Sequence, residues 1–241
     1  MRKAGGVVPG LNTVMRQEKK YAIDIAQGAV LSAKLARIMI PDEHNGPEGY
    51  VIRSMYFDTP GDSDYNDKVE GLELRRKLRL RIYDPAQGFA MLEMKQKSGP
   101  YQLKRSLRLT REDAQRLARG DYSPLLGYPE PFAAECYELM ATRCYRPKTV
   151  VEYDRTAYIA RENHIRITFD RRIRASESDM ELFAPCPAYS PVMDPFGLVL
   201  EVKYNGFILS YIKDLLNSVH RPEVSVSKYC LARSFTLGAM D

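Results

Sequence analysis

The segment that most restricts the possible folds of this chain is 72–84, LELRRKLRLRIYD. Every second side chain from Arg75 to Arg81 is basic, and the side chains between them are apolar except for Arg76. Successive side chains of a β-strand point to opposite faces of its sheet. The segment therefore predicts a strand with one apolar face and one cationic face.

The same alternation of apolar and charged side chains recurs along the chain. We expect further strands over 16–26, 50–60, 89–98, 102–110, 149–160, 164–175 and 197–206. We expect helices over 27–40, after Thr110, near 131–145 and over 207–219, and a closing segment over 225–238. About eight strands with a few helices between them indicate the α+β class.

Several strands with aligned cations are difficult to accommodate in one ordinary sheet, because like charges on neighbouring strands repel each other. A polyanion between the strands relieves this repulsion. We therefore expect an eight-stranded antiparallel β-barrel with a polar, cationic lumen and with helices packed outside. The planar guanidinium of arginine matches phosphate oxygens, so a triphosphate or longer phosphate chain suits this lumen. The alternative for each single strand is a solvated basic face.

Charge and composition favour a local anion site over a generally basic surface. The 241 residues carry 36 Lys and Arg against 31 Asp and Glu, a net charge of +5. Segment 68–108 holds 11 of these basic residues and 4 acidic ones, so its balance of +7 exceeds that of the whole chain.

The cysteine content and the hydrophobicity of the chain indicate its cellular compartment and its domain organisation. The 4 cysteines match no zinc-binding pattern, and no apolar segment is long enough for a membrane span. We therefore expect a cytoplasmic protein without a membrane segment. We expect residues 1–15 to be a flexible lead-in and residues 16–241 to form a single domain.

Carboxylates share the expected charged faces with the cations. They are Glu18, Glu93, Glu152, Asp154, Asp170 and Glu201. A site for nucleotide phosphates also needs a divalent metal, and carboxylate oxygens suit Mg²⁺ or Mn²⁺. An ion pair with Arg or Lys is the alternative role for each acid. The chain has no GxxxxGK[ST] loop and no GxSxG motif, and its 3 histidines show no recognisable nucleophile setting.

Nine short segments, in order, resemble the VTC domain. This domain is the polyphosphate polymerase module of the vacuolar transporter chaperone complex, within the triphosphate tunnel metalloenzyme (CYTH-like) superfamily. The segments are ExKY (18–21), YVIRSMYFDTP, KLRLRIY, LEMKQK, LKRS, EYDRTAY, IRITFD, LEVKY and SKY (227–229). The resemblance runs from about Arg16 to Leu237 and implies an eight-stranded antiparallel barrel whose lumen binds triphosphate or polyphosphate.

The resemblance also implies roles for individual residues. The catalytic cations would be Arg79, Arg81, Lys95 and Lys228. The phosphate-binding residues would be Lys20, Lys104, Arg155, Arg166 and Lys203. Glu201 would bind Mn²⁺ or Mg²⁺, and Asp170 lies in a matching segment. In the family's reaction, ATP donates its γ-phosphoryl group to a growing polyphosphate chain and ADP is released.

Other functions stay open at this point. One is triphosphate hydrolysis, although the ExExK signature of the hydrolase branch is reduced here to Glu18-Lys19-Lys20. Another is a non-catalytic sensor of polyphosphate or nucleotides. Nucleic-acid binding would require stacking aromatics among the cations, and the basic faces carry few besides Tyr83, so we expect no nucleic-acid partner. Eukaryotic members carry an SPX domain and a membrane region. We expect neither here, so coupling to translocation is not implied.

Overall fold

The computed structural model describes residues 16–99 and 101–238, and the predicted lead-in, residues 1–15, lies outside them. Eight long strands form one antiparallel sheet. They are β1 (Arg16–Asp24), β3 (Tyr50–Asp58), β4 (Leu74–Ile82), β5 (Phe89–Ser98), β6 (Tyr101–Thr110), β7 (Arg146–Ala160), β8 (Ile165–Ser176) and β10 (Gly197–Asn205). Each long strand that we expected from the alternation is present, with ends that differ by a few residues.

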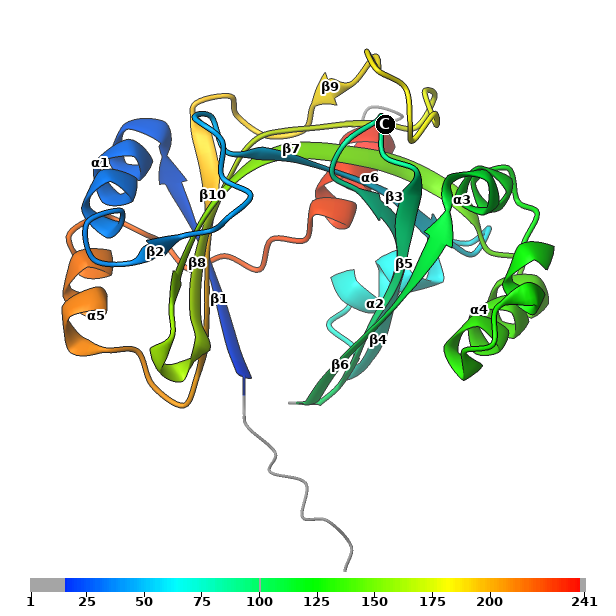
Figure 1. The fold of residues 1–241 in the computed structure, drawn as a ribbon, viewed down its shortest axis with the longest axis horizontal. Helices are drawn as coiled ribbons and strands as arrows, with labels where there is room; N and C mark the ends of the chain where they lie inside the picture. The colour runs from blue at the N-terminus through cyan, green and yellow to red at the C-terminus, as the bar shows by residue number, and fades with distance from the viewer. Residues whose placement is uncertain (1–15, 100, 239–241) are drawn as a thin grey trace, which may run out of the picture.

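The sheet curves into an arch with the strand order β1-β10-β8-β7-β3-β4-β5-β6 (Figure 1). The short strands β2 (Ile40–Pro41) and β9 (Ser190–Pro191) pair with β7 and β8. The predicted fold class is confirmed, but the sheet is not closed into a barrel, since no backbone ladder joins β1 to β6 in the described ranges. An ion pair crosses from β5 to β1 instead, because Lys95 Nζ lies 3.1 Å from Glu18 Oε2.

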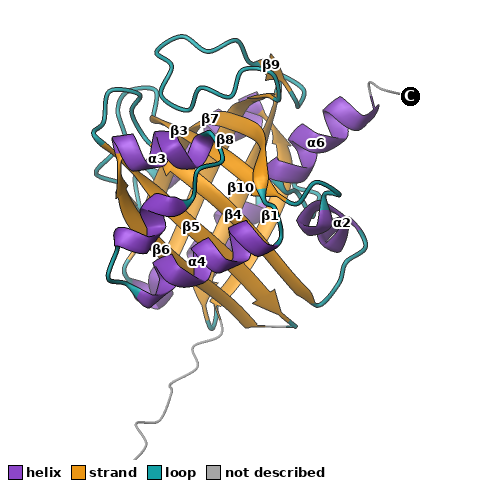
Figure 2. Cartoon of the chain, turned by 90° about the vertical axis from the view of Figure 1, so that its right-hand side faces the viewer, coloured by secondary structure: helices purple, strands orange, loops and turns teal. Residues whose placement is uncertain are grey.

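Helices cover the convex side of the arch on both wings. On one wing, α1 (Ile25–Leu35) and α5 (Ser210–Asn217) pack against β1, β8 and β10. On the other, α3 (Arg111–Ala118), the 3₁₀ helix η1 (Ser123–Gly127) and α4 (Pro131–Thr142) cover β4, β5 and β6 (Figure 2). The alternating apolar residues of these strands, such as Leu78, Leu80 and Leu92, are fully buried beneath them. The basic faces of the strands are therefore left to line the concave side.

Two further helices, α2 (Ser63–Val69) and α6 (Lys228–Gly238), lie on the concave side of the arch (Figure 1). Tyr229 and Ala232 of α6 join a third core cluster with residues of β3, β7, β8 and β10. The short 3₁₀ helix η2 (Glu162–His164) connects β7 to β8. No helix within the described ranges combines the length and the hydrophobicity that crossing a bilayer requires.

Local polar contacts explain where the helices begin. The carboxylate of Asp24 accepts a hydrogen bond from Gln27 N at 2.7 Å, so β1 ends and α1 begins two residues before the expected boundaries. Thr110 caps α3 as expected, because its hydroxyl accepts from Asp113 N at 3.1 Å. Helix α2 was not expected. Its first turn is capped from the preceding strand by the Asp58 carboxylate.

Candidate functional site

The concave face of the sheet brings together nine of the ten predicted site residues, in three groups of ion pairs. The first group is built around Glu93, the second around Asp170, and the third around Glu18 and Glu201. Neighbouring strands that each present a charged side chain at every second position supply nearly all of these residues, and α6 supplies Lys228. We call these three groups the inner lumen.

The Glu93 group joins three cations from β4 and β6. Arg79 Nη2 lies 2.7 Å from the Glu93 carboxylate, Lys104 Nζ lies 2.5 Å from it and Arg81 Nη1 lies 3.6 Å from it. Burial raises the pKa of Glu93, but the three cations outweigh that effect and bring the pKa to about 2. Arg79 also donates to the Tyr56 hydroxyl at 3.1 Å. The carboxylate thus fixes the direction in which these cations point.

The Asp170 group lies at the junction of β7, β8 and α6. Arg155 donates to the two Asp170 oxygens at 2.6 and 2.8 Å, and Lys228 Nζ lies 2.5 Å from the second. Burial lowers the pKa of Lys228, but the charge of Asp170 more than offsets it and the pKa is raised. Asp170 itself is fully buried, so this pair of cations is held in a single arrangement.

Tyr153 connects the Asp170 group to the Glu93 group. Its ring lies under the Arg155 guanidinium and the Lys228 ammonium, at 5.3 and 4.5 Å from the ring centroid. Burial raises the pKa of this phenol, but the positive charges of Arg155, Arg81 and Lys228 lower it by more than that. The net shift of the pKa is therefore downward. We did not expect Tyr153 in the lumen, because the alternation on β7 showed only that it was apolar.

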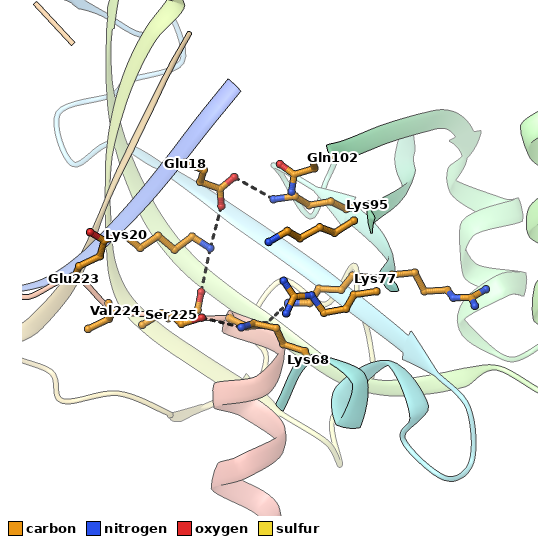
Figure 3. A pocket seen from close by; sticks show the side chains of 14 residues that line it. Glu18, Lys20, Lys68, Lys77, Lys95, Gln102, Glu223, Val224 and Ser225 are labelled. Carbon is orange, nitrogen blue, oxygen red and sulfur yellow. Dashed lines mark hydrogen bonds and ion pairs between the residues drawn. The ribbon is translucent and has the colours of Figure 1, made fainter. Parts of the chain in front are cut away.

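The third group contains two carboxylates on the adjacent strands β1 and β10. Lys20 lies opposite Glu201 in the ladder and Glu18 lies opposite Lys203, so acids and lysines alternate on one face. Lys20 Nζ is 3.2 Å from Glu18 and Lys95 Nζ is 3.1 Å from Glu18 (Figure 3). Lys203 pairs with Glu201, and its Nζ also lies 3.9 Å from Glu18. All five side chains therefore form one continuous network.

Both carboxylates of this group stay ionised. Burial and the charge of Glu201 raise the pKa of Glu18, but the lysines lower it to about 2. Burial likewise raises the pKa of Glu201, and Lys203 and Lys20 bring it well below its usual range. Within the described ranges no group of three or more His, Cys, Asp or Glu could hold a metal ion. The donor set still fits Mg²⁺ or Mn²⁺, which is commonly held by one or two carboxylates with phosphate oxygens as further ligands.

Arg166 is the predicted site residue that lies apart. Its guanidinium is 2.7 Å from the buried carboxylate of Asp42 and donates to the Tyr50 hydroxyl at 3.1 Å. Asp42 belongs to the turn-rich segment 41–49, in which we predicted no functional residue. Arg166 lies opposite Lys203 in the ladder between β8 and β10 and so shares its face, but its charge is paired with a loop carboxylate instead of with the three groups.

Glu152 and Asp154 do not belong to the charged face of the lumen, contrary to our expectation. Arg53 Nε lies 2.6 Å from Glu152, and Arg172 pairs with Asp154. The alternation along β7 gives the concave face to Tyr153 and Arg155, so Glu152 and Asp154, on either side of Tyr153, face the other way. Both are partners in structural ion pairs.

A cavity of about 550 Å³ opens beside the third group. Among the predicted site residues, Lys20 and Lys95 line it (Figure 3). It is also lined by residues to which no role was assigned, which are Lys68, Arg75, Arg76, Lys77, Lys97, Gln102 and segment 223–227. The strand alternation placed Arg75, Lys77 and Lys97 on the charged faces, whereas Lys68 lies on the unexpected helix α2 and had no sequence signal.

Comparison with known proteins adds to this geometry. The family model described as the VTC domain matches residues 15–237. The chain belongs to the VTC domain family. The resemblance inferred from the nine segments is thus confirmed. A comparison with curated protein sequences finds no match.

Solved structures resemble this VTC domain at low sequence identity. A candidate adenylate cyclase from Vibrio parahaemolyticus is 14% identical, with a TM-score of 0.49, and 90% of this chain and 97% of that chain are covered. A candidate adenylate cyclase from Bacillus halodurans is 11% identical, with a TM-score of 0.48 and coverages of 85% and 88%. The PH1819 protein from Pyrococcus horikoshii is 11% identical, with a TM-score of 0.45 and coverages of 89% and 97%.

The site of this VTC domain is suited to binding anions that carry several charges. Its cations already point toward one face, and four carboxylates hold them there. Family membership supports a tunnel protein that acts on triphosphates.

Proposed function

We propose that this VTC domain is a polyphosphate polymerase. It transfers the γ-phosphoryl group of ATP to the end of a growing polyphosphate chain and releases ADP. The observation that carries the proposal is the inner lumen, in which cations from β1, β4, β5, β6, β7, β10 and α6 converge on buried carboxylates. Such fixed cations suit phosphoryl transfer, which depends mainly on positioning and on neutralising charge.

In this mechanism the acceptor is itself the nucleophile. A terminal oxygen of the polyphosphate chain attacks the γ-phosphorus of ATP, a new P–O bond forms, and the bond to the β-phosphate oxygen breaks in line. Arg79 and Arg81 bind the equatorial oxygens, where negative charge must be neutralised, and Lys228 binds the phosphate that leaves with ADP. Glu93 and Asp170 hold these cations in place before substrate arrives. No Ser or Cys nucleophile is required.

The remaining cations bind the phosphate chain. The side chains that line the lumen are Lys20, Lys95, Lys104, Arg155 and Lys203. Arg166 shares the face of Lys203 and pairs with Asp42. We propose Glu201, with Glu18 beside it, as the carboxylates that hold Mn²⁺ or Mg²⁺. When bound, the ion supplies positive charge to the nucleotide phosphates. The acids' low pKa values keep both carboxylates available as ligands at neutral pH.

The same acids argue against triphosphate hydrolysis. A hydrolase needs a group that takes a proton from water, and such a base works best with a pKa near the operating pH. Glu18 and Glu93, with pKa values of about 2, are weak bases. The proposed partners are therefore ATP and polyphosphate. We also propose a cytoplasmic location, because the four cysteines are free.

The test is to incubate the purified protein with ATP and Mn²⁺ and to separate the products by gel electrophoresis and nucleotide chromatography. We expect a ladder of phosphate chains together with a matching amount of ADP. Orthophosphate and ADP without a ladder would instead establish a hydrolase. Binding of added polyphosphate without turnover would leave a sensor. The Arg79→Ala variant is the control for a contaminating activity, since it should make no ladder.

A further inference from the structure

Four cations at the cavity mouth differ from those of the inner lumen. They are Lys68 of α2, Arg75 and Lys77 of β4, and Lys97 of β5, and we call them the mouth cations. Among residues 16–99 and 101–238, none of them forms an ion pair with a carboxylate. Instead, Lys77 Nζ donates to the Ser227 hydroxyl at 2.5 Å and Lys68 Nζ donates to the Ser225 hydroxyl at 2.8 Å.

The mouth cations are close enough to disturb one another. Burial lowers the pKa of Lys77 to about 7, and the charges of Lys20, Lys95 and Lys68 contribute to the shift. Burial also lowers the pKa of Lys68, with Arg75, Lys20 and Lys97 acting in the same direction. Holding like charges together in a partly buried cavity costs free energy. A bound anion would remove that cost.

The two acids that line the cavity, Glu18 and Glu223, are engaged with other cations. Glu18 pairs with Lys20 and Lys95, and Glu223 pairs with Lys19 at 3.4 Å. The mouth therefore differs in kind from the inner lumen, where each cation has a carboxylate partner. A network that only stabilised the fold would include acids at the mouth as well.

The segment that closes the cavity supplies further hydrogen-bond donors. Residues 223–227 line it, and they end where α6 begins at Lys228. The Ser227 hydroxyl also accepts from Cys230 N at 3.3 Å, which places Ser227 at the start of the helix. The hydroxyls of Ser225 and Ser227 now accept from lysines, and both could turn to donate to a phosphate oxygen. The chemistry of the mouth thus matches a chain of phosphates.

We propose that the mouth cations form a second phosphate-binding subsite, which holds the part of a long polyphosphate chain that extends beyond the inner lumen. The subsite makes the protein select long chains over triphosphate. This inference rests on the proposed function, since it assumes that phosphates occupy the inner lumen. In this arrangement the mouth cations bind the distal part of a long polyphosphate chain, and the inner lumen carries out the phosphoryl transfer.

The test compares two ligands on matched variants by isothermal titration calorimetry. The ligands are tripolyphosphate and a long-chain inorganic polyphosphate. The mouth variant carries Arg75→Gln, Lys77→Gln and Lys97→Gln. The control variant loses the same number of charges at exposed positions on other parts of the surface, through Arg37→Gln, Arg143→Gln and Lys213→Gln. Thermal unfolding of both variants verifies that they are folded.

We expect wild type to bind the long chain more tightly than tripolyphosphate. The mouth variant should lose at least about 10-fold in affinity for the long chain, and less than about 2-fold for tripolyphosphate, because only the long chain reaches the lost charge-assisted contacts. The control variant should bind both ligands like wild type. Equal weakening for both ligands, an unchanged affinity for the long chain, or the same loss in the control variant would each overturn the subsite.

The two proposals fail in different ways. If wild type makes a polyphosphate ladder from ATP but the mouth variant binds long chains normally, the polymerase stands and the subsite is wrong. If wild type makes no ladder but binds long chains through the mouth cations, the subsite stands and the polymerase is wrong. If wild type binds neither ligand, both are wrong.

Discussion

The inner lumen and the cavity mouth are both basic, but they balance their charges in opposite ways. In the lumen, Arg79 and Lys104 share Glu93, and Arg155 and Lys228 share Asp170. At the mouth, Lys68 and Lys77 have only serine hydroxyls as partners in the described structure. The same strands, β4 and β5, contribute cations to both regions. The difference therefore lies in where the acids are.

The comparison shows two ways to prepare a site for a polyanion. A carboxylate partner orients a cation and offsets the cost of removing it from water, so the lumen is well ordered without a ligand. A cation without a carboxylate partner keeps its full charge for the ligand, but it destabilises the empty protein. Chemistry that needs fixed geometry fits the first arrangement, and holding a chain of variable length fits the second.

The largest effect should come from removing a cation of the inner lumen. We expect Arg79→Ala, Arg81→Ala or Lys228→Ala to lower turnover of ATP into polyphosphate by about 100-fold or more, since each group neutralises charge at the transferring phosphate. The fold should persist because Glu93 and Asp170 each keep another cation. The matched control is Arg116→Ala, which removes an exposed ion pair with Asp121. Wild-type turnover in all three variants would remove the inner lumen from catalysis.

The next effect should come from removing an acid of the lumen. Glu201→Gln should reduce metal-dependent activity by at least about 10-fold while still binding polyphosphate, because it loses a metal ligand and not a phosphate contact. Activity is measured against Mn²⁺ concentration and affinity by calorimetry. A variant with the metal dependence of wild type would exclude Glu201 from the metal site. Glu135→Gln, at a partly buried pair with Arg105 on the convex side, is the control.

The sequence allowed us to predict the lumen better than the mouth, for a physical reason. The period of two along a strand fixes which side chains share a face, so Arg79, Lys95 and Lys104 could be placed together before the fold was known. Lys68 could not, because helix α2 has only seven residues and is capped by Asp58 from the strand before it. No local pattern indicates a helix of that kind.

Two other features of the fold also escaped the alternation. The ladder between β7 and β8 shifts register between Glu152 and Asp154, and Arg172 adopts a positive φ of 51°. Past this bulge Ile173 joins the concave cluster, while Arg172 pairs with Asp154 on the other face of the sheet. The prediction of a closed barrel was wrong, because the alternation shows which face of each strand is polar but not whether the two edge strands pair.

A smaller effect should appear in stability when a mouth cation is removed. Because the folded-state pKa of Lys77 is about 7, below the ordinary value of 10.5, the unfolded chain binds the extra proton between these values. Lys77→Met should therefore raise the free energy of unfolding by about 1 kcal/mol at pH 6, and by less as the pH rises from 7 toward 10.5. Denaturant titrations at several pH values measure this gain.

Polyphosphate should reverse the order, since it stabilises the protein that binds it more tightly. With saturating long chains, wild type should gain more stability than Lys77→Met. Lys213→Met, at an exposed position of α5, should match wild type in both conditions. A destabilised Lys77→Met protein, without ligand, would show that Lys77 supports the fold and would break the contrast between mouth and lumen.

The smallest effect on function should come from Asp64, a buried acid on α2 that lies 3.6 Å from Arg76 but contacts none of the mouth cations. Burial and the charge of Asp58 raise its pKa to about 7, although the Tyr145 hydroxyl and Arg76 act against the shift. The folded protein then holds a proton that the unfolded chain releases above 3.8, so this group's contribution to stability falls as the pH rises from about 4 to 7.

Asp64→Asn cannot ionise and keeps an oxygen to accept from Tyr145. Relative to this variant, wild type should lose on the order of 1 kcal/mol between pH 5 and pH 8. Denaturant unfolding at both pH values measures the difference, and parallel pH profiles would show that Asp64 does not titrate there. Because Asp64 lies outside the set of mouth cations, polyphosphate affinity should be unchanged in the variant. A gain of long-chain affinity would instead mean that the negative charge of Asp64, and not only Lys77 and its neighbours, sets the electrostatic potential of the mouth.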